Sequence, residues 1–360
     1  MYIAGGMDEE WRNRIALVWA NRTRPRKARE LLDHYASATE AIARHPDMVT
    51  REALRHAEEE LAFIERHQIA IYYYKDAEYP YRLAQCVDAP LLLYGKGNLN
   101  VNPRHVVSIV GTRVPTERGK DWCHRLVTDL ARLVPDVTIV SGLAYGIDVA
   151  AHRAALEAGV PTIIIPAHGL DRIYPAVHRD VAVRALESGG ILTEYTCGTE
   201  PERYNFVARN RIIAGMADAV VVVESKAKGG SLITAQMAQD YDREVFALPG
   251  RIDDVTSAGC NRLIKKQQAQ LIDSAEDIVQ TMQWQVSKQP VQTSLVELGC
   301  DLNERQRGIL QLLREAEDGL HVNQIVMEMQ MPYNDVSSEL VMMELQDVVK
   351  SLPGGMWRAR

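Results

Sequence analysis

Hydrophobic positions divide the chain into three regions with different periodicities. Over residues 8–67, apolar side chains recur three and four positions apart with few β-branched runs, which is typical of amphipathic helices. We therefore expect a helical N-terminal domain over residues 1–70. Residues 71–99 combine tyrosines with prolines and glycines, and this composition predicts an irregular connector.

Short apolar runs alternate with helix-length amphipathic stretches over residues 100–285. The run Ala219–Glu224 is apolar on both faces, as expected of a parallel strand covered by helices on each side. Repeated strand–helix–strand units predict an α/β fold with a doubly wound, mostly parallel sheet. The expected strands are Val106–Val110, Thr138–Ser141, Thr162–Pro166, Ile191–Thr193, Ala219–Glu224, Glu244–Leu248 and Gln270–Ile272.

The C-terminal region begins after a polar stretch that predicts a linker over residues 286–300. Over residues 301–360, three helical stretches precede two strand-like ones, which is the order of a winged helix. The expected helices are Arg305–Glu315, Val322–Met329 and Tyr333–Leu345. This domain has six basic against ten acidic residues, and its third helix has no basic residue. Because phosphate neutralisation supplies most nonspecific affinity, we predict that it does not bind DNA by itself.

The composition indicates a globular protein with a sizeable core, because 46% of the 360 residues are hydrophobic and 25% are charged. The 41 basic and 48 acidic side chains give a net charge of −7, which excludes nucleic-acid binding over the whole surface but permits a local basic cleft. Five widely spaced cysteines argue against a disulfide framework or a zinc knuckle. Neither a signal peptide nor a membrane-spanning apolar run is present, so we expect a cytoplasmic protein without membrane contact.

Candidate chemistry lies at four places where an expected strand gives way to a helix, the edge of an open parallel sheet at which ligands bind. These turns supply glycines, arginines, a lysine and hydroxyls, which are groups that hold phosphates. Thr116 is the expected N-cap of the helix after the first turn. Neither a Walker A loop nor a Gly-x-Gly-x-x-Gly fingerprint is present. The candidate binding residues are Gly111, Arg113, Ser141, Gly142, Gly146, Phe206, Arg209, Asn210, Arg211, Lys228, Gly230, Ser231 and Thr234.

Two further patterns allow a functional and a structural interpretation. Asp148 and His152, four positions apart on one helix, could be a metal pair or an acid–base couple, but a third ligand at suitable spacing is missing, so we favour structural hydrogen bonds. The segment Arg22–Arg29 has five positive charges in eight residues. It could contact phosphate at a helix start, although a solvated connector is the more common role of such a run.

Taken together and in this order, the motifs resemble the DNA-processing protein A family (DprA or Smf) of bacterial transformation factors. The matching pieces are Ile109–Arg113, Ser141–Asp148 with His152, Gly169–Asp171 with Tyr174 and Pro175, Arg209–Gly215, Gly230–Ala235 and Val245–Gly250. The resemblance implies an extended Rossmann-like domain between an N-terminal helical domain, of the SAM or helix–hairpin–helix-like kind, and a C-terminal winged helix. It further implies a non-enzymatic protein without a cofactor or metal that binds single-stranded DNA, forms a homodimer and helps load the RecA recombinase.

The resemblance also gives the candidate residues roles. Phosphates would follow a basic pocket, and Phe206 or Tyr204 would stack on a base. The basic pocket would consist of Arg113, Arg209, Arg211 and Lys228. The dimer would form through Leu263, Ile264, Leu271 and Ile272. The chain departs from the family pattern in lacking a Gly-x-Gly hairpin, with Arg22–Pro25 in its place, and in having Lys265–Ala269 near the dimer segment.

Two other classes of function remain open on the residues alone. A nucleotide-binding hydrolase on the same type of sheet would use Glu194 or Glu224 as acid or base, and release of free base from a nucleoside monophosphate would support it. A winged-helix transcriptional regulator would bind duplex DNA sequence-specifically. The chain lacks the compact Gly-Gly-x-Gly turn typical of the first class, and the acidic winged helix argues against the second.

Overall fold

The computed structural model describes residues 8–285, 302–316, 319–346, 348–352 and 354–359. The chain divides into two compact units, Met1–Ser287 and Lys288–Arg360. The linker expected over residues 286–300 lies outside the described residues.

The N-terminal region is helical, as its periodicity predicts. The helices are α1 (Asp8–Ala20), α2 (Pro25–His34), α3 (Ala38–Arg44) and α4 (Arg51–His67), with a 3₁₀ turn at Pro46–Met48. Hydroxyl caps define two of the starts: Ser37 accepts from the Glu40 amide before α3, and Thr50 from the Ala53 amide before α4. A shared apolar cluster that includes Ile15 packs these helices against the edge of the sheet.

The prediction of an irregular connector over residues 71–99 is wrong for two segments, which form strands. Ala70–Tyr73 forms β1 and Leu92–Lys96 forms β2, with the short helix α5 (Tyr81–Ala84) between them. β2 pairs antiparallel with both β1 and β6, which extends the sheet at one edge. Tyrosines of these strands are buried against the N-terminal helices, so tertiary packing selects the strand conformation here.

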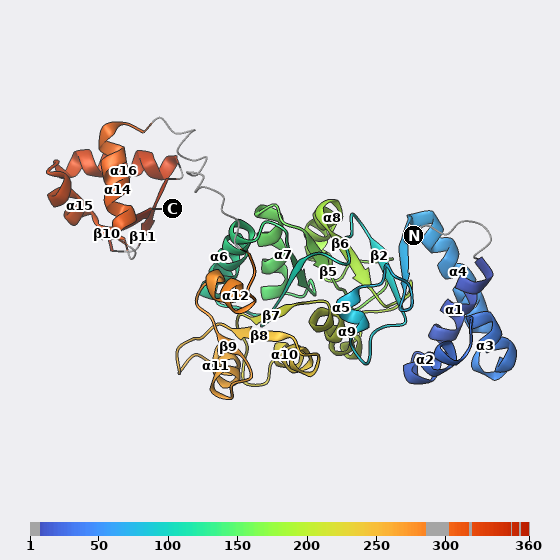
Figure 1. Cartoon of the computed structure of the whole chain (residues 1–360). Coiled ribbons are helices and arrows are strands. Elements are labelled where there is room, and N and C mark those ends of the chain that lie inside the picture. Colours follow the sequence, from blue (N-terminus) through green and yellow to red (C-terminus); the bar gives the residue numbers. More distant parts are fainter. Residues whose placement is uncertain (1–7, 286–301, 317–318, 347, 353, 360) are drawn as a thin grey trace. The chain divides into compact units, whose positions relative to one another are not determined.

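The expected parallel sheet is confirmed (Figure 1). In the described part of the chain it has nine strands in the order β1-β2-β6-β5-β4-β3-β7-β8-β9, and all strands from β3 onward run parallel. These strands are β3 (His105–Val110), β4 (Val137–Ser141), β5 (Thr162–Ile164), β6 (Gly190–Thr193), β7 (Ala219–Val222), β8 (Glu244–Ala247) and β9 (Gln270–Leu271). Each strand lies where the sequence predicts it. Four of them (β5, β7, β8 and β9) end one or two residues earlier than expected.

Helices cover both faces of this sheet (Figure 1). One face carries α6 (Glu117–Leu133), α7 (Ile147–Glu157), α8 (Arg179–Ser188) and α12 (Ala275–Thr281). The other carries α5, α9 (Arg203–Gly215), α10 (Ser231–Asp240) and α11 (Ala258–Lys265). Successive residues of β3 belong to opposite cores, Val106 to the α9 side and Val107 to the α6 side, which explains why the strands read as continuous apolar runs.

The order of the strands places a topological switch point at the centre of the sheet, between β3 and its neighbours. β4, β5 and β6 lie on one side of β3, whereas β7, β8 and β9 lie on the other. The chain therefore leaves β3 toward α6 and leaves β7 toward α10, on opposite faces. In open α/β sheets the carboxyl ends of strands at such a switch point are the usual ligand site.

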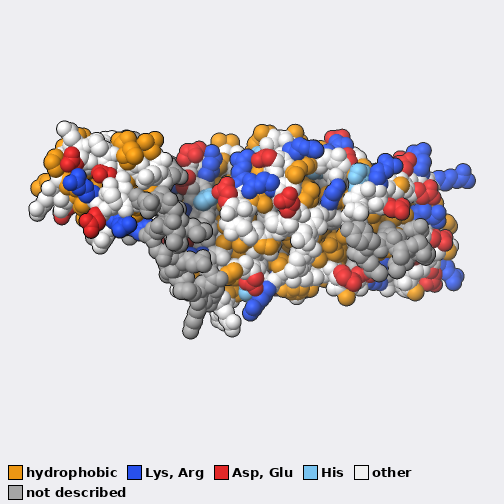
Figure 2. All heavy atoms as spheres, turned by 90° about the horizontal axis from the view of Figure 1, so that it is seen from above, with side chains coloured by type: hydrophobic (Ala, Val, Ile, Leu, Met, Phe, Trp, Pro, Cys, Tyr) orange, Lys and Arg blue, Asp and Glu red, His pale blue; other side chains and the backbone are white. Residues whose placement is uncertain are grey.

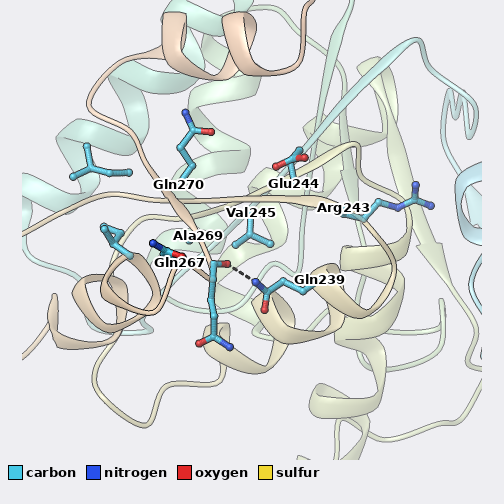
Figure 3. Close-up of a pocket in the computed structure, with 10 residues that line it drawn as sticks. Gln239, Arg243, Glu244, Val245, Gln267, Ala269 and Gln270 are labelled. Atoms are coloured by element: carbon cyan, nitrogen blue, oxygen red, sulfur yellow. Dashed lines mark hydrogen bonds between the residues drawn. The ribbon is translucent and has the colours of Figure 1, made fainter.

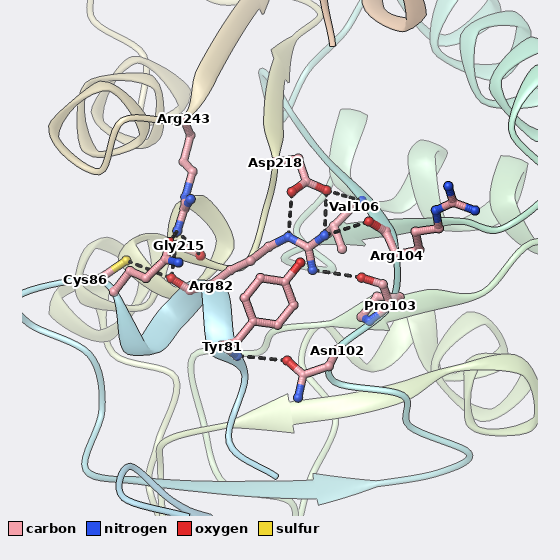
Figure 4. A network of polar contacts seen from close by, with 11 residues as sticks. Tyr81, Arg82, Cys86, Asn102, Pro103, Arg104, Val106, Gly215, Asp218 and Arg243 are labelled. Carbon is pink, nitrogen blue, oxygen red and sulfur yellow. Dashed lines mark hydrogen bonds and ion pairs between the residues drawn. The ribbon is translucent and has the colours of Figure 1, made fainter. Parts of the chain in front are cut away.

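The opposite, amino edge of the sheet is held by a buried arginine (Figure 4). Arg82 of α5 donates to both carboxylate oxygens of Asp218, at 2.6 and 2.8 Å, and to the carbonyl oxygens of Pro103 and Arg104. Asp218 in turn accepts from the Val106 amide. The guanidinium thus ties α5 to the starts of β3 and β7, and this network explains how a short helix is anchored at that edge.

The C-terminal unit confirms the winged-helix prediction. Its elements are α14 (Glu304–Glu315), β10 (Leu320–His321), α15 (Val322–Met329), α16 (Tyr333–Leu345), β11 (Val349–Leu352) and β12 (Met356–Ala359). The strands pair in the order β10-β12-β11, so the wing gains a third strand that the sequence pattern did not predict. None of the helices described in either unit is long and apolar enough to cross a bilayer.

Candidate functional site

The turn after β3 presents an arginine beside a tightly fixed helix start. Thr116 caps α6 by accepting from the Gly119 amide at 3.0 Å, as the sequence predicts. Glu224, after β7, accepts from the Thr116 amide and hydroxyl at 2.9 and 2.5 Å. A Cβ on Gly111 would lie 2.5 Å from Ile147, so only glycine fits there. The turn is therefore rigid, and the Arg113 side chain projects from it into solvent.

The turn after β4 packs against the first turn. Gly146 has a φ of +83°, and a Cβ on it would lie 2.2 Å from the carbonyl oxygen of Thr112, so glycine is required on two grounds. Leu143 also has a positive φ, of +60°. Ser141 is buried and donates to the Ile109 carbonyl, and this bond links β4 to β3. Ser141 and Gly146 thus shape the edge and present no side chain to it.

Arg209 is a buried strut inside this edge. The α9 side chain is 2% exposed and donates to the carbonyl oxygens of Gly142, at 2.8 Å, and Ile165. A Cβ on Gly142 would lie 2.2 Å from the guanidinium, so the glycine makes room for it. Burial lowers the Arg209 pKa to about 10. The structure therefore differs from the expectation that Arg209 contacts phosphate directly, because the side chain is buried and its Nη1 donates to two backbone carbonyl oxygens.

Arg211 lies two positions farther along α9 and is also taken up inside the protein. Its guanidinium pairs with Glu194, and both side chains are 17% exposed. Asn210, between the two arginines, is half-buried. Neither Arg209 nor Arg211 is therefore free to face a ligand at the edge.

Phe206 is the centre of an aromatic and cationic group that the fold brings together. The Arg113 guanidinium carbon lies 5.1 Å from the centre of the Phe206 ring, and the Tyr174 ring meets it edge-on at 5.9 Å. Tyr204, the second residue of α9, is 78% exposed. We call Arg113, Phe206, Tyr174 and Tyr204 the edge cluster. It combines an exposed positive charge with flat side chains, the groups that hold a phosphate and an unpaired base.

The turn after β7 adds exposed positive charge next to β3, the strand that leads to Arg113. Lys226 and Lys228 are exposed. The Gly229 amide is not available to a phosphate, because it donates to the Lys226 carbonyl at 3.1 Å. Gly230 begins α10 in open space, where a Cβ would meet nothing. Two hydroxyls expected to face a ligand are buried, Ser231 at 7% and Thr234 at 1% exposure.

Asp148 and His152 do not form a metal or acid–base pair. His152 is fully buried and its Nδ1 lies 2.7 Å from the Thr162 hydroxyl, and burial lowers its pKa to about 3. Asp148 instead accepts from the Ala144 amide. The described residues hold no group of three or more candidate metal-ligating side chains. These contacts agree with the structural interpretation of the pair.

The two carboxylates considered for hydrolase chemistry are both occupied. Glu224 accepts the two hydrogen bonds from Thr116 that fix α6, and Glu194 pairs with Arg211. A general acid or base needs a carboxyl group that can reach the substrate. The geometry of this edge therefore favours binding over acid–base catalysis.

Two exposed tyrosines of the edge were not among the predicted site residues. Tyr174 and Tyr145 are 45% and 48% exposed, and the Tyr145 ring lies edge-on to that of His178. Tyr174 belongs to a motif that carries the family resemblance, but its proximity to Phe206 depends on two connections that are far apart in sequence. The pattern of residues alone had no signal for that contact.

Comparisons with known proteins agree with this arrangement. A family model described as DNA recombination-mediator protein A matches residues 70–283, and one described as the DprA winged helix domain matches residues 297–355. The DNA processing protein DprA of Streptococcus pneumoniae is 41% identical over 201 residues, which cover 56% of this chain and 70% of that protein. Protein Smf of Escherichia coli is 35% identical over 284 residues, covering 78% and 75%.

Two solved structures are similar as well. The X-ray structure of DprA from Streptococcus pneumoniae has a TM-score of 0.60 at 31% identity and covers 78% of this chain and 98% of that one. A Helicobacter pylori structure, described as giving insight into the single-stranded DNA binding mode of its DprA, has a TM-score of 0.54 at 32% identity. It covers 60% of this chain and 96% of that chain.

Proposed function

This chain belongs to the DprA/Smf family of DNA recombination-mediator proteins, and from that premise we propose that it binds single-stranded DNA at the edge cluster and helps load the RecA recombinase. The observation that carries the first part is the Arg113–Phe206 contact, which places an exposed guanidinium beside an aromatic ring at the switch point of the sheet.

The physical chemistry of this edge favours single strands over duplex. Phosphate contacts to Arg113 and Lys228 give affinity that does not depend on sequence and falls with salt. Phe206, Tyr174 and Tyr204 offer flat surfaces, and stacking on such a ring is worth about 1–3 kcal/mol per base. A duplex hides its bases and cannot use these rings.

A fluorescence anisotropy titration tests the proposed binding. Labelled oligo-dT is compared with a blunt duplex of the same length over a salt series. We expect the single strand to bind more tightly than the duplex at every salt concentration. The logarithm of its association constant should fall linearly with the logarithm of the salt concentration. Equal or tighter binding of the duplex would contradict the proposal, and release of free base from a nucleoside monophosphate would support a hydrolase instead.

The recombinase part of the proposal is supported by family membership. A protein that holds a single strand by its phosphates and a few rings leaves most bases of a long strand free for a recombinase to cover. The test measures RecA filament assembly on single strands with and without this protein. We expect faster assembly with the wild-type chain and no acceleration with Arg113→Glu, and an equal effect of both would argue against it.

We further propose a homodimer through the segment around β9. Leu271 is 46% exposed and lines, with the half-buried Ile264, a hollow of about 490 Å³ beside β8 (Figure 3). Leu263 and Ile272 are buried in the two cores of the sheet at 5% and 0% exposure, so their side chains are not available to a partner. The two available residues therefore carry this proposal.

Replacing Leu271 with glutamate is expected to convert the dimer into a monomer. A charge in the centre of an apolar contact would have to be desolvated without a partner. Light scattering at tens of micromolar, a range in which weak dimers with Kd of about 1 μM are populated, should give twice the chain mass for the wild type and a single mass for the variant. A wild-type monomer under these conditions would contradict the dimer proposal.

The winged-helix unit is expected not to bind DNA on its own. In the described part of α16, Asp335 and Glu344 carry negative charge, and the exposed side chains Val341, Met342 and Leu345 are apolar. Such a helix in a major groove would oppose the phosphates with like charge. Titration of fragment 300–360 against duplex and single strands at low salt should show no binding. Micromolar affinity for either form of DNA would overturn this prediction, and sequence-specific duplex binding would favour a transcriptional regulator.

A further inference from the structure

The basic segment at the start of α2 is exposed and lacks acidic partners in the described residues. Arg22, Arg24, Arg26 and Lys27 are all exposed, and no carboxylate pairs with any of them in the described part of the chain. Figure 2 shows Lys and Arg side chains projecting from the N-terminal helices. Four unpaired positive charges within six residues form a local field of one sign in a chain whose net charge is −7.

The placement of these charges is unfavourable for the helix that carries them. α2 begins at Pro25 with no side-chain cap and no acidic residue in its first turn. Cations near a helix N-terminus oppose the helix dipole, with an effect of about 0.3–1 kcal/mol each. An arrangement that opposes the stability of its own helix is expected at a functional site, because folding alone does not account for it.

Contacts of the neighbouring helices place this segment at the same edge of the sheet as the edge cluster. Arg29 of α2 donates to the Ala89 carbonyl at 2.6 Å and lies over the Tyr74 ring. Tyr74 follows β1 and Ala89 precedes β2, so Arg29 contacts the end of β1 and the start of β2, which lie side by side. The pairing of Tyr94 with Thr193 aligns the start of β2 with the carboxyl end of β6. The basic segment therefore lies at the carboxyl edge of the sheet.

A second set of contacts links the segment to the connection that leads into α9. The Arg22 guanidinium lies 4.2 Å from the centre of the Trp19 ring, and Trp19 stacks on His56 at 4.5 Å. His56 in turn lies 3.0 Å from the Thr196 hydroxyl, in the loop between β6 and α9. That loop continues into the helix that carries Phe206. These contacts connect the basic segment, through two rings, to the loop that leads to Phe206.

We propose that Arg22, Arg24, Arg26 and Lys27, called the N-terminal basic surface, bind the phosphate backbone of the same single strand after it leaves the edge cluster. This inference rests on the proposed function and adds a second segment to its binding site. The ligand is recognised by phosphate charge alone. The chain would then bind long strands more tightly than short ones.

The test compares Arg24→Glu/Arg26→Glu with the matched control Arg104→Glu/Arg132→Glu, which makes the same change in net charge at the amino edge of the sheet. Arg104 precedes β3 and its side chain points away from the Arg82 network (Figure 4), and Arg132 lies exposed at the end of α6. Binding is measured with a short and a long oligo-dT. A single-strand module covers roughly 4–16 nucleotides, so the short strand of about six nucleotides fits one module and the long strand of about thirty extends well beyond it.

We expect the Arg24→Glu/Arg26→Glu variant to lose about tenfold in affinity for the long strand near 0.1 M salt, with a salt slope smaller by about 0.7 for each lost contact. Affinity for the short strand should not change, and the control should bind both strands like the wild type. The midpoint of thermal unfolding should stay the same or rise, because glutamate suits a helix N-terminus. Arg24→Gln/Arg26→Gln, which only removes charge, should give a smaller loss of the same kind.

Three results would overturn the inference. One is equal long-strand binding by the variant and the control, and another is an equal loss for both strand lengths. The third is a loss confined to a blunt duplex of about thirty base pairs, beyond the single-module range, which would make the surface a duplex contact. Failure of the proposed function is distinguishable from these, because the wild-type chain would then bind neither oligo-dT.

Discussion

The double variant Arg113→Glu/Lys228→Glu is expected to lose at least about tenfold in affinity for oligo-dT near 0.1 M salt, and its salt slope should fall by about 0.7 for each lost phosphate contact. Both side chains are exposed at the carboxyl ends of adjacent strands, β3 and β7. Arg113 also lies over the Phe206 ring, so its loss removes a cation–π contact from the stacking surface. Each glutamate adds repulsion to the loss of attraction.

The same substitutions should leave the fold intact. Both side chains are exposed and neither has an ion pair in the described residues, and exposed substitutions of this kind change stability by about 0.5 kcal/mol or less. Arg104→Glu/Arg132→Glu, which makes the same change in net charge at the amino edge of the sheet, is the control for a change of charge alone. Unchanged binding by the double variant, or an equal loss with the control, would refute the edge cluster as the binding site.

Replacement of Arg209 with methionine is expected to destabilise the protein by about 3 kcal/mol or more. The guanidinium satisfies the buried carbonyl oxygens of Gly142 and Ile165, and an unsatisfied buried group costs about 1–3 kcal/mol. Removal of the charge also takes away the larger of the two cationic influences on the buried Asp148, which Arg209 shares with Arg113. Urea unfolding should show a lower midpoint with an unchanged slope.

Arg203→Met on the same helix supplies the matched control. Arg203 is exposed, so its replacement should change the free energy of unfolding by about 0.5 kcal/mol or less. If Arg209→Met were as stable as the wild type but did not bind single strands, Arg209 would be a phosphate contact, as the sequence suggested, and its role as a strut would be wrong.

Much of the fold was predictable from local patterns. Parallel strands such as β7 read as apolar runs because both of their faces are covered, and Thr116 was predicted as a cap because its hydroxyl acts on an amide three residues away. The winged helix was predicted for the same reason, since its helices have a clear periodicity. β1 and β2 were missed because their tyrosines are buried by the N-terminal helices, which are distant in sequence.

The candidate site was predictable only as a region. The sequence places Arg113, Arg209 and Arg211 at strand–helix junctions, and a parallel sheet gathers such junctions at one edge. Which of these arginines faces solvent depends on how α9 crosses beneath the strand ends, and that packing buries Arg209 and Arg211.

The sequence by itself therefore determined the layered α/β fold, the winged helix and the edge at which ligands meet the sheet, because each follows from spacing along a few neighbouring residues. Only the tertiary structure decided that Arg113 is a surface charge and Arg209 a buried strut, and that Phe206 meets Tyr174. The physical reason is that the direction of a side chain depends on which distant segments fill the space around it, and arginine can either satisfy buried carbonyls or face water.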